Sequence, residues 1–168
     1  MESTATTRFD LTPPTAEEIA RLASGLSEEE RHVLLDHGTE APFCGVFLQE
    51  KRDGTYCCRL CGLPLFKGGS KFESGTGWPS FTEPFAEGHL QYLDDSSYGM
   101  TRTEIVCARC GAHQGHVFPD GPPPTGERYC INSVSLEFTP KGEALPDKLD
   151  RGAPEGVAWD EGRRPNNR

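Results

Sequence analysis

The chain has seven cysteines, and four of them form two Cys-x-x-Cys pairs. Cys58 and Cys61 make the first pair, Cys107 and Cys110 make the second, and a glycine follows each pair. Two residues between thiolates allow one tight turn to direct both sulfurs at one ion, and two such turns complete the tetrahedral set that zinc prefers. A glycine after each turn suits a left-handed backbone. The spacing therefore predicts one structural Zn²⁺ per chain, bound by these four cysteines.

Other uses of the two pairs fit the sequence less well. A redox Cys-x-x-Cys usually opens a helix in a βαβ setting, and neither flank here has that pattern. Two disulfides would require an oxidising compartment, and the N-terminal residues lack the basic and apolar regions of a secretion signal. Because four thiolates leave no open coordination position, we expect the zinc to hold the fold together and to take no part in catalysis.

Three cysteines remain: Cys44, Cys57 and Cys130. Cys57 precedes a predicted zinc ligand, so on a strand it would face the opposite way, and packing is its expected role. Cys44 lies in Pro-Phe-Cys-Gly, at a loop-to-strand entry where a thiol could stay accessible. Around Cys130 the residues alternate as in a strand, which would place Asn132 on the same face. From the residues alone, Cys130 could be a buried hydrophobe, a metal ligand, a disulfide half or a nucleophile.

Two further segments contain side chains that suit a binding or catalytic site. His113 and His116 directly follow the second cysteine pair, so the zinc turn would hold them rigidly. A metal bound by these two alone would be under-ligated, and either histidine could be a hydrogen-bonded structural residue. The glycine-rich turn before Phe81 brings Trp78 and Phe81 together. These two rings would be either core or an apolar wall for a ligand with sulfur and methyl groups.

The elements that position these groups are expected to be short. With 168 residues the chain forms one ordinary domain, and its 19 glycines and 14 prolines argue against a mostly helical fold. Capping-box spacings that start at Thr15 and Ser27 predict two short helices, the second of which ends near Gly38. Strands are predicted at 43–49, 55–58, 101–106 and 127–138, the first two joined by a hairpin at Asp53-Gly54.

The same patterns divide the chain into a flexible N-terminus at 1–12, a single catalytic domain at 13–140 that includes the helices and the zinc site, and a charged, partly disordered tail at 141–168. The formal net charge of −9 argues against nucleic acid as a partner. No stretch has the apolar length of a membrane span. The absence of a visible targeting segment favours a cytoplasmic protein.

Four stretches of the chain together resemble one known family. These are TYCCRLCGLPLF, KFESGTGWPSF, EIVCARCGAHQGHVFPDGPPPTGERYCINSVSLEF and, more loosely, HGTEAPFCGVFL, which span roughly residues 37–139. They resemble the methionine-R-sulfoxide reductases, the B class of peptide-methionine sulfoxide reductases. The resemblance implies a mainly β fold of two antiparallel sheets, often likened to a tent, clamped by zinc at one end. The predicted short helices would precede this fold.

The resemblance also implies a reaction and roles for individual residues. Cys130 would attack the sulfur of the R epimer of methionine sulfoxide, peptide-bound or free, and become a sulfenic acid. His113, His116 and Asn132 would line the polar side of the site and protonate the departing oxygen. Trp78 would hold the substrate methyl group, with Phe118 on the same apolar side. Arg128 would assist by its charge, since positive or hydrogen-bonding neighbours lower the pKa of a thiol.

The sequence departs from one family pattern, because Thr76 occupies the position where many members carry a second, resolving cysteine. Cys44 is the expected substitute, with Cys57 or an external thiol as the other possibilities. Thioredoxin is the expected reductant of an internal disulfide, and we expect a monomer. The alternative is a non-enzymatic zinc-clamped β domain that binds a protein or a small ligand through Trp78, Phe81 and the histidines. A binding module, however, has no need for Cys130 beside Asn132.

Overall fold

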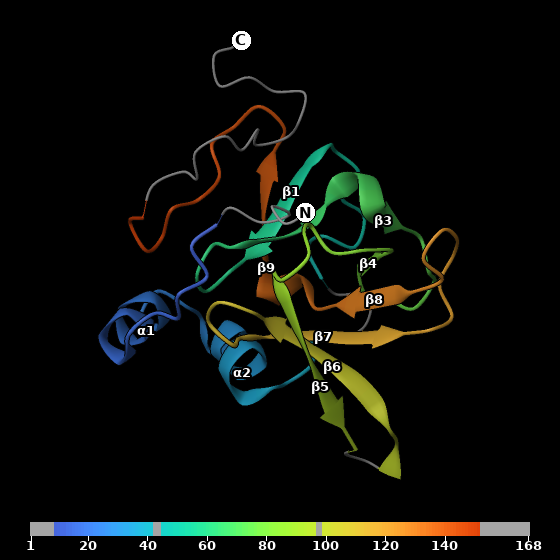
Figure 1. Ribbon diagram of the computed structural model, residues 1–168, viewed down its shortest axis with the longest axis horizontal. Coiled ribbons are helices and arrows are strands. Elements are labelled where there is room, and N and C mark those ends of the chain that lie inside the picture. The colour runs from blue at the N-terminus through green and yellow to red at the C-terminus, as the bar shows by residue number, and fades with distance from the viewer. Residues whose placement is uncertain (1–8, 42–44, 97–98, 152–168) are drawn as a thin grey trace.

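The computed structural model describes residues 9–41, 45–96 and 99–151, which form two short helices and two antiparallel sheets (Figure 1). The helices are α1 (Ala16–Ala23) and α2 (Glu28–Asp36). The three-stranded sheet has the order β2 (Pro64–Lys67), β1 (Gly54–Cys58), β9 (Leu136–Pro140). The six-stranded sheet has the order β3 (Lys71–Phe72), β4 (Ser80–Phe81), β8 (Arg128–Ile131), β7 (His113–Phe118), β6 (Arg102–Cys107), β5 (Leu90–Asp95). The mainly β fold class predicted from the sequence is therefore confirmed.

Both predicted helices begin at their capping boxes. The hydroxyls of Thr15 and Ser27 each accept the backbone N–H of the glutamate three residues later at 3.1 Å, and that glutamate accepts the N–H of the cap at 2.9 Å. The second helix ends at Asp36, and His37, not Gly38, adopts the left-handed conformation with φ of 59°. Histidine is one of the residue types that tolerate this conformation better than most. The turn directs the His37 side chain towards β6.

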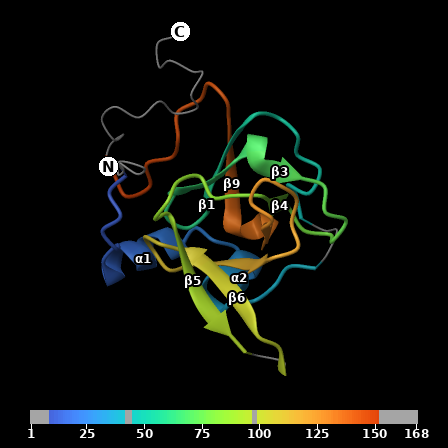
Figure 2. The same ribbon diagram turned by 45° about the vertical axis from the view of Figure 1, so that its right-hand side comes forward.

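Aromatic side chains from both sheets form the centre of the core. Phe66 and Phe81 stack with ring centroids 4.4 Å apart, and Tyr56 packs edge-on against Phe81 at 5.1 Å. Tyr129 of β8 contacts Phe66 at 5.8 Å, and all four rings are buried. Figures 1 and 2 show β1 and β9 crossing the direction of β7 and β8 at this point. The sequence left open whether Phe81 belongs to the core or to an apolar wall for a ligand, and the structure places it in the core.

The predicted strand at 43–49 is wrong where the structure describes it. Residues 42–44 lie outside the described residues, and 46–49 form turns with i→i+3 backbone hydrogen bonds of 3.3 and 3.2 Å. The Phe47 ring packs against Tyr56 and Phe138 at 5.7 and 6.3 Å. Its N–H donates to the Ser133 hydroxyl at 3.2 Å. Apolar burial and a side-chain acceptor therefore satisfy this segment without a strand. The predicted strands 55–58 and 101–106 correspond to β1 and β6.

The predicted strand 127–138 is broken in the middle. β8 ends at Ile131, a 3₁₀ turn follows at Ser133–Ser135, and β9 begins at Leu136. The break transfers the chain from the six-stranded sheet to the three-stranded sheet. The buried carboxylate of Glu40 accepts the backbone N–H groups of Ser133 and Val134 at 2.8 and 3.0 Å, in place of a ladder partner.

The predicted domain boundaries stay predictions, because residues 1–8 and 152–168 lie outside the described part of the chain. Within that part, Phe9 packs against Phe85 and His89 with ring centroids 6.0 and 5.3 Å apart, and Leu149 is buried. Among the described residues, no helix is both long enough and apolar enough to cross a membrane.

We predict that Glu40→Gln destabilises the fold. The glutamine side chain has one carbonyl oxygen for two backbone N–H donors, and its own NH₂ group would face one of them. An unsatisfied buried donor costs about 1–3 kcal/mol, which chemical denaturation monitored by circular dichroism will measure. Glu29→Gln is the matched control, because Glu29 is exposed on α2. Equal stability of the two variants would contradict the assignment.

Candidate active site and metal centre

The two Cys-x-x-Cys pairs form two turns with the same backbone geometry. The N–H of Gly62 donates to the carbonyl of Cys58 at 2.8 Å, and the N–H of Gly111 donates to that of Cys107 at 2.8 Å. Both glycines are left-handed, with φ of 88° and 79°. This confirms the backbone conformation predicted from their positions. A side chain at either position would be strained.

The four sulfurs converge at one point. The Sγ atoms of Cys58 and Cys110 are 3.6 Å apart, as are those of Cys61 and Cys107, and all four lie within 4.8 Å of one another. A tetrahedral ion with Zn–S distances of about 2.3 Å places its sulfurs roughly 3.8 Å apart. The arrangement therefore fits the zinc ion that the spacing predicts.

Polar groups around the sulfurs suit a negatively charged metal–thiolate centre. The Arg109 guanidinium is buried, and it donates to Cys61 Sγ at 3.4 Å and to the Cys61 carbonyl at 2.8 Å. The Gln114 amide donates to Cys58 Sγ at 3.6 Å. One divalent ion with four thiolates has a net charge of −2, so a buried cation at this distance stabilises it.

Cys130 lies on a central strand of the six-stranded sheet, between β4 and β7. The register pairs it with Ser80 on one side and with His116 on the other. Directly opposed residues in antiparallel strands point to the same face, so the imidazole of His116 and the thiol of Cys130 are neighbours. One position further along the same face, Phe118 is paired with Arg128.

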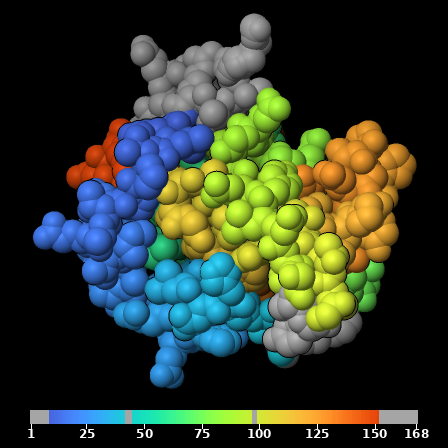
Figure 3. Space-filling model, turned by 60° about the horizontal axis from the view of Figure 1, so that its bottom comes forward, coloured from blue at the N-terminus to red at the C-terminus, as the bar shows by residue number. Residues whose placement is uncertain are grey.

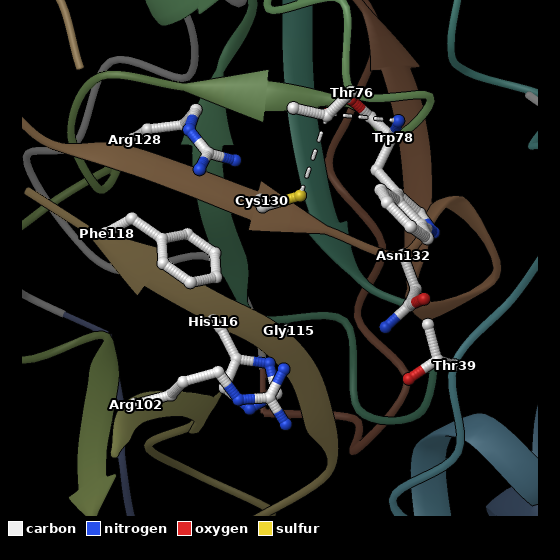
Figure 4. Close-up of a pocket in the computed structure, with 10 residues that line it drawn as sticks. All are labelled: Thr39, Thr76, Trp78, Arg102, Gly115, His116, Phe118, Arg128, Cys130 and Asn132. Atoms are coloured by element: carbon white, nitrogen blue, oxygen red, sulfur yellow. Dashed lines mark hydrogen bonds between the residues drawn. The ribbon is translucent and has the colours of Figure 1, made fainter. Parts of the chain in front are cut away.

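These side chains line a pocket of about 300 Å³ (Figure 4). Figure 4 shows the sulfur of Cys130 between an aromatic ring on one side, Phe118, and the indole of Trp78 on the other. His116 lies below the sulfur in this view. The complete lining is Thr39, Thr76, Trp78, Arg102, Gly115, His116, Phe118, Arg128, Cys130 and Asn132.

A β-bulge places both histidines on one side of the sheet. His113 is paired with Val106, and Gly115 is paired with the next residue, Ile105, so Gln114 is an extra residue in β7. A regular strand would point residues three apart to opposite faces. The bulge reverses this, and the two imidazole rings lie 5.7 Å apart.

Gly115 allows β7 and β8 to approach closely behind Cys130. A Cβ atom on Gly115 would lie 2.0 Å from the carbonyl oxygen of Cys130 and 3.0 Å from the Cα of Ile131. Because the obstructing atoms belong to the backbone, no side-chain movement could relieve the contact.

The glycine-rich loop supplies the opposite wall of the pocket. The Thr76 hydroxyl lies 3.9 Å from Cys130 Sγ, and it accepts the backbone N–H of Trp78 at 3.4 Å. The Trp78 indole N–H donates to the carbonyl of Glu40 at 3.0 Å. The indole is therefore held at its polar edge while its ring lines the pocket.

Asn132 lines the pocket with an amide that the backbone already holds. Its Oδ1 accepts the N–H of Glu40 at 2.9 Å, and its Nδ2 donates to the carbonyl of Gln114 at 3.0 Å. Both contacts fix the amide orientation. A ligand in the pocket would meet an oriented amide group.

Burial raises the pKa of the Cys130 thiol above its ordinary value. The Thr76 hydroxyl and the Arg128 guanidinium both act in the opposite direction, but they do not overcome the burial. Arg128 does lie on the pocket side, where its guanidinium carbon is 4.5 Å from the Phe118 ring centroid. Its Nε donates to Asp120 at 2.9 Å, and this carboxylate offsets part of its charge. The prediction that neighbouring groups lower the pKa of Cys130 is therefore right for the separate effects of Thr76 and Arg128. The pKa is nonetheless raised, because burial has the larger effect.

The two histidines have different acidic partners. Nε2 of His116 lies 2.7 Å from Asp95, and Asp95 also accepts from Arg102 at 3.2 Å. Nδ1 of His113 lies 2.7 Å from Glu104, outside the Cys130 pocket and in a neighbouring cavity. Burial lowers the pKa of His113 even though the Glu104 carboxylate opposes this.

The structure brings together six of the residues predicted for the site, namely Cys130, His116, Asn132, Trp78, Phe118 and Arg128. His113 lines the adjacent cavity instead, and Cys44 lies outside the described residues. The roles of all these residues in a reaction stay predictions. Cys57 is completely buried, as its predicted packing role requires.

Sequence reasoning missed several groups around the pocket. Arg102 and Glu104 alternate on the predicted strand 101–106, so their shared face was a usable signal. No pattern in the neighbouring sequence marked Glu40, because the two N–H groups that its carboxylate accepts are more than 90 residues away in the chain. Thr39, which lines the pocket, and Asp95, which contacts His116, were also missed.

Comparison with known proteins gives consistent matches over most of the chain. Residues 26–140 match the SelR domain. A peptide methionine sulfoxide reductase MsrB of Caulobacter vibrioides is 66% identical over 148 residues, which cover 88% of this chain and 93% of that protein. The proteins of the same name from Xylella fastidiosa (strain M23) and Escherichia coli (strain K12 / DH10B) are 61% and 56% identical. These matches cover 86% and 75% of this chain, and 93% and 90% of those proteins. The chain belongs to the MsrB family.

The part of the chain that matches the SelR domain contains both centres described above. The matched SelR region includes all four cysteines of the metal centre and all ten residues that line the Cys130 pocket. It begins within the loop before α2 and ends with the last residue of β9.

We predict that Cys61→Ser removes the metal and unfolds this MsrB protein. Zinc binding contributes on the order of 10 kcal/mol to the folding of small zinc domains, which is comparable with the whole stability of a domain. Elemental analysis should fall from about one zinc ion per chain towards zero. Cys130→Ser is the control, because it removes a thiol outside the cluster. A folded, zinc-free Cys61→Ser protein would contradict a structural role.

We predict that Cys130 reacts with iodoacetamide more slowly at neutral pH than an unperturbed cysteine. Only the thiolate reacts, and a raised pKa leaves less thiolate at pH 7. The rate for the Cys130 peptide, followed by mass spectrometry, should rise through a pKa above the ordinary value. Arg128→Gln should move that pKa further up, because it removes a cation that favours the thiolate. A downward movement in this variant would exclude the assigned role of Arg128.

Proposed function

We propose that this MsrB protein reduces the R epimer of methionine sulfoxide to methionine, with Cys130 as the nucleophile. The supporting observation is the position of the Cys130 thiol between apolar rings and oriented polar groups in one pocket. Membership of the MsrB family supports the same reaction. The substrate would be peptide-bound methionine sulfoxide, with the free amino acid as a smaller alternative.

The chemical step transfers one oxygen atom from sulfur to sulfur. The Cys130 sulfur bonds to the sulfoxide sulfur. The new S–S bond and the S–O bond of the substrate then both break as the oxygen bonds to the Cys130 sulfur, which becomes a sulfenic acid. The thiol proton ends on that oxygen, and neutral methionine leaves, so atoms and electrons balance. His116, which is paired with Cys130 in the register, would carry the proton from sulfur to oxygen.

A protonated resting thiol suits this step. Because burial keeps the Cys130 pKa high, the proton that the oxygen requires is present in the free enzyme. The histidine would accept it as the sulfur attacks, and would return it to the departing oxygen. His113 would assist through its contact with the neighbouring ring, in keeping with the role that the family resemblance implies.

The two sides of the pocket would select one epimer. The sulfoxide sulfur has an oxygen, a methyl group, the methionine side chain and a lone pair. We place the sulfoxide oxygen towards His116 and Asn132, and the methyl group against Trp78. The rest of the methionine side chain would then leave through the pocket opening. Only one configuration at the sulfoxide sulfur satisfies these positions and still presents the sulfur to Cys130. Phe118 and Arg128 would flank that side chain.

We further propose that Cys44 resolves the sulfenic acid and that thioredoxin reduces the product. Condensation of the sulfenic acid with the Cys44 thiol gives a disulfide and water, and a thioredoxin dithiol restores both thiols. Cys44 lies outside the described residues, but its neighbours support the proposal. The Glu40 carbonyl holds Trp78 at the pocket, and a Cβ on Gly45 would meet Ser133. Complete burial argues against Cys57 in this role.

Zinc bound by the four cysteines would supply structural cross-linking of the two sheets. Cys58 and Cys61 extend from β1, and Cys107 and Cys110 extend from β6, so the centre joins one sheet to the other. The reaction needs Cys130 as a free thiol, which favours a reducing compartment such as the cytoplasm. We propose a monomer, in which ten of the described residues together line the pocket.

The proposal is tested by offering each sulfoxide epimer separately with dithiothreitol and measuring the methionine formed. We expect the R epimer to be consumed and the S epimer to remain. In a single turnover without reductant, wild type should give about one methionine per chain, and Cys130→Ser should give none. Reduction of the S epimer alone, or turnover by Cys130→Ser, would overturn the proposal.

The same assay separates the resolving step from the chemical step. Cys44→Ser should still form one methionine per chain in the single turnover, but it should lose thioredoxin-driven cycling. Cys57→Ser is the matched control and should keep that cycling if it folds. Unchanged cycling by Cys44→Ser would assign regeneration to an external thiol.

A further inference from the structure

Three side chains from separate segments meet beside the Cys130 pocket. They are His37 at the end of α2, Glu104 on β6 and His113 at the start of β7. Oε2 of Glu104 lies 2.5 Å from Nδ1 of His37 and 2.7 Å from Nδ1 of His113. The potential ligand atoms of all three lie within 4.8 Å of one another. Two imidazole nitrogens thus face a single carboxylate oxygen, and we refer to this group as the His37–Glu104–His113 cluster.

Two imidazoles and one carboxylate form a common ligand set for a divalent transition metal. Zinc sites of this type keep a fourth position open for water. With ligands about 2.1 Å from a tetrahedral ion, neighbouring ligand atoms lie roughly 3.4 Å apart. The present hydrogen bonds would therefore have to open by less than about 1 Å, well within the reach of a side-chain rotation.

One ligand of the cluster can move, and the other two are held in place. The side chain of His37 is 54% exposed, whereas those of His113 and Glu104 are 3% and 13% exposed. Glu104 sits in the β6–β7 ladder opposite His116, and the His113 carbonyl accepts the Ser135 hydroxyl at 2.9 Å. Two strand-mounted ligands and one adjustable ligand from a helix end make a partly preorganised site.

The cluster lines a cavity of about 540 Å³ in which negative charge predominates. Asp36, Asp95 and Glu104 contribute three carboxylates, and Arg102 contributes the single guanidinium among the lining residues. Such a cavity attracts cations. Figure 3 shows the face on which α2, in cyan, meets the yellow-green β5–β6 region that supplies these groups. The volume also leaves room for water in the open coordination position.

We propose that the His37–Glu104–His113 cluster binds one divalent transition-metal ion, separate from the zinc of the four cysteines. Coordination uses the Nδ1 lone pair of each neutral imidazole in the tautomer that has its proton on Nε2, and the metal ion takes the place of the hydrogen bonds between Nδ1 and Glu104. His113 and His116 alone are under-ligated for a metal, whereas His113 together with Glu104 and His37 offers three ligand atoms.

Occupation of the cluster would inhibit the reductase. His116 and Arg102 line both this cavity and the Cys130 pocket, so an ion here places positive charge beside the proton-carrying histidine. It also fixes the ring of His113. This consequence rests on the proposed function, whereas metal binding by the cluster does not.

The test measures binding of Zn²⁺ to full-length, zinc-loaded protein by titration calorimetry. Cys44 and Cys130 are both changed to serine, so that accessible thiols do not compete. We expect the zinc content to rise from one to two ions per chain. His37→Ala and Glu104→Gln should each weaken the second site at least about 10-fold while they retain the first ion. His32→Ala is the matched control, because His32 lines the same cavity outside the cluster.

Co²⁺ provides an independent reading of the ligands. At this site it should give weak visible bands without the intense near-ultraviolet absorption of thiolate coordination. Retention of the first zinc ion and an unchanged circular dichroism spectrum show that each variant is folded. Failure to bind a second ion, equal binding by all variants, or thiolate bands with Co²⁺ would each overturn the proposal. Metal binding without inhibition would overturn only the regulatory consequence.

Discussion

The buried side chain and backbone of Glu40 form the contact on which the geometry of the pocket depends. Its carboxylate accepts the backbone N–H groups of Ser133 and Val134, at the point where the chain passes from the six-stranded sheet to the three-stranded sheet. Its own N–H and carbonyl hold the amide of Asn132 and the indole of Trp78. This one residue, which follows α2, therefore secures three features of the site: the break between β8 and β9, the amide of Asn132 and the indole of Trp78. Burial raises its pKa, so the fold retains a carboxyl group at an energetic cost.

The antiparallel register then determines how the reactive groups face one another. Because His116 is opposite Cys130 and Phe118 is opposite Arg128, a thiol, an imidazole, an aromatic ring and a guanidinium lie on one surface over only two pairs of residues. The four-cysteine cluster lies at the end of β6 from which β7 follows. The sheet therefore sets the distances among these four pocket side chains, and the glycine-rich loop adds Thr76 and Trp78.

The sequence predicted those parts of the molecule that rest on short-range patterns. Both capping boxes, the two cysteine turns and the strands around Tyr56 and Ile105 depend on residues a few positions apart, and these were found. The break at Ser133 was missed, because its acceptor is a carboxylate more than 90 residues away. The strand expected at 43–49 failed for a similar reason, since the burial of Phe47 against Tyr56 satisfies that segment without a ladder.

The residues of the candidate site also fall into two classes, those marked by short-range patterns and those placed by contacts between distant parts of the chain. Cys130, Asn132 and Trp78 could be named from the residues and their spacing, and the family resemblance supplied their expected roles. Asp95 became visible only when the fold placed it beside His116, whereas the alternation that marks Glu104 was present in the sequence. Net electrostatics could not be anticipated either, because the pKa of Cys130 depends on how far the folded chain excludes water from it.

The bulge at Gln114 has a consequence for the interpretation of sequence motifs. A His-x-x-His spacing is commonly associated with one face of an α-helix, where residues three apart are adjacent. Here a strand with a single surplus residue produces the same adjacency, with the rings 5.7 Å apart. Helical periodicity and a bulged strand are thus indistinguishable in such a motif. Loss of the surplus residue would leave the histidines two positions apart, which is the same face of a regular strand, so His-x-His and a bulged His-x-x-His would both place the two rings on one side of the sheet.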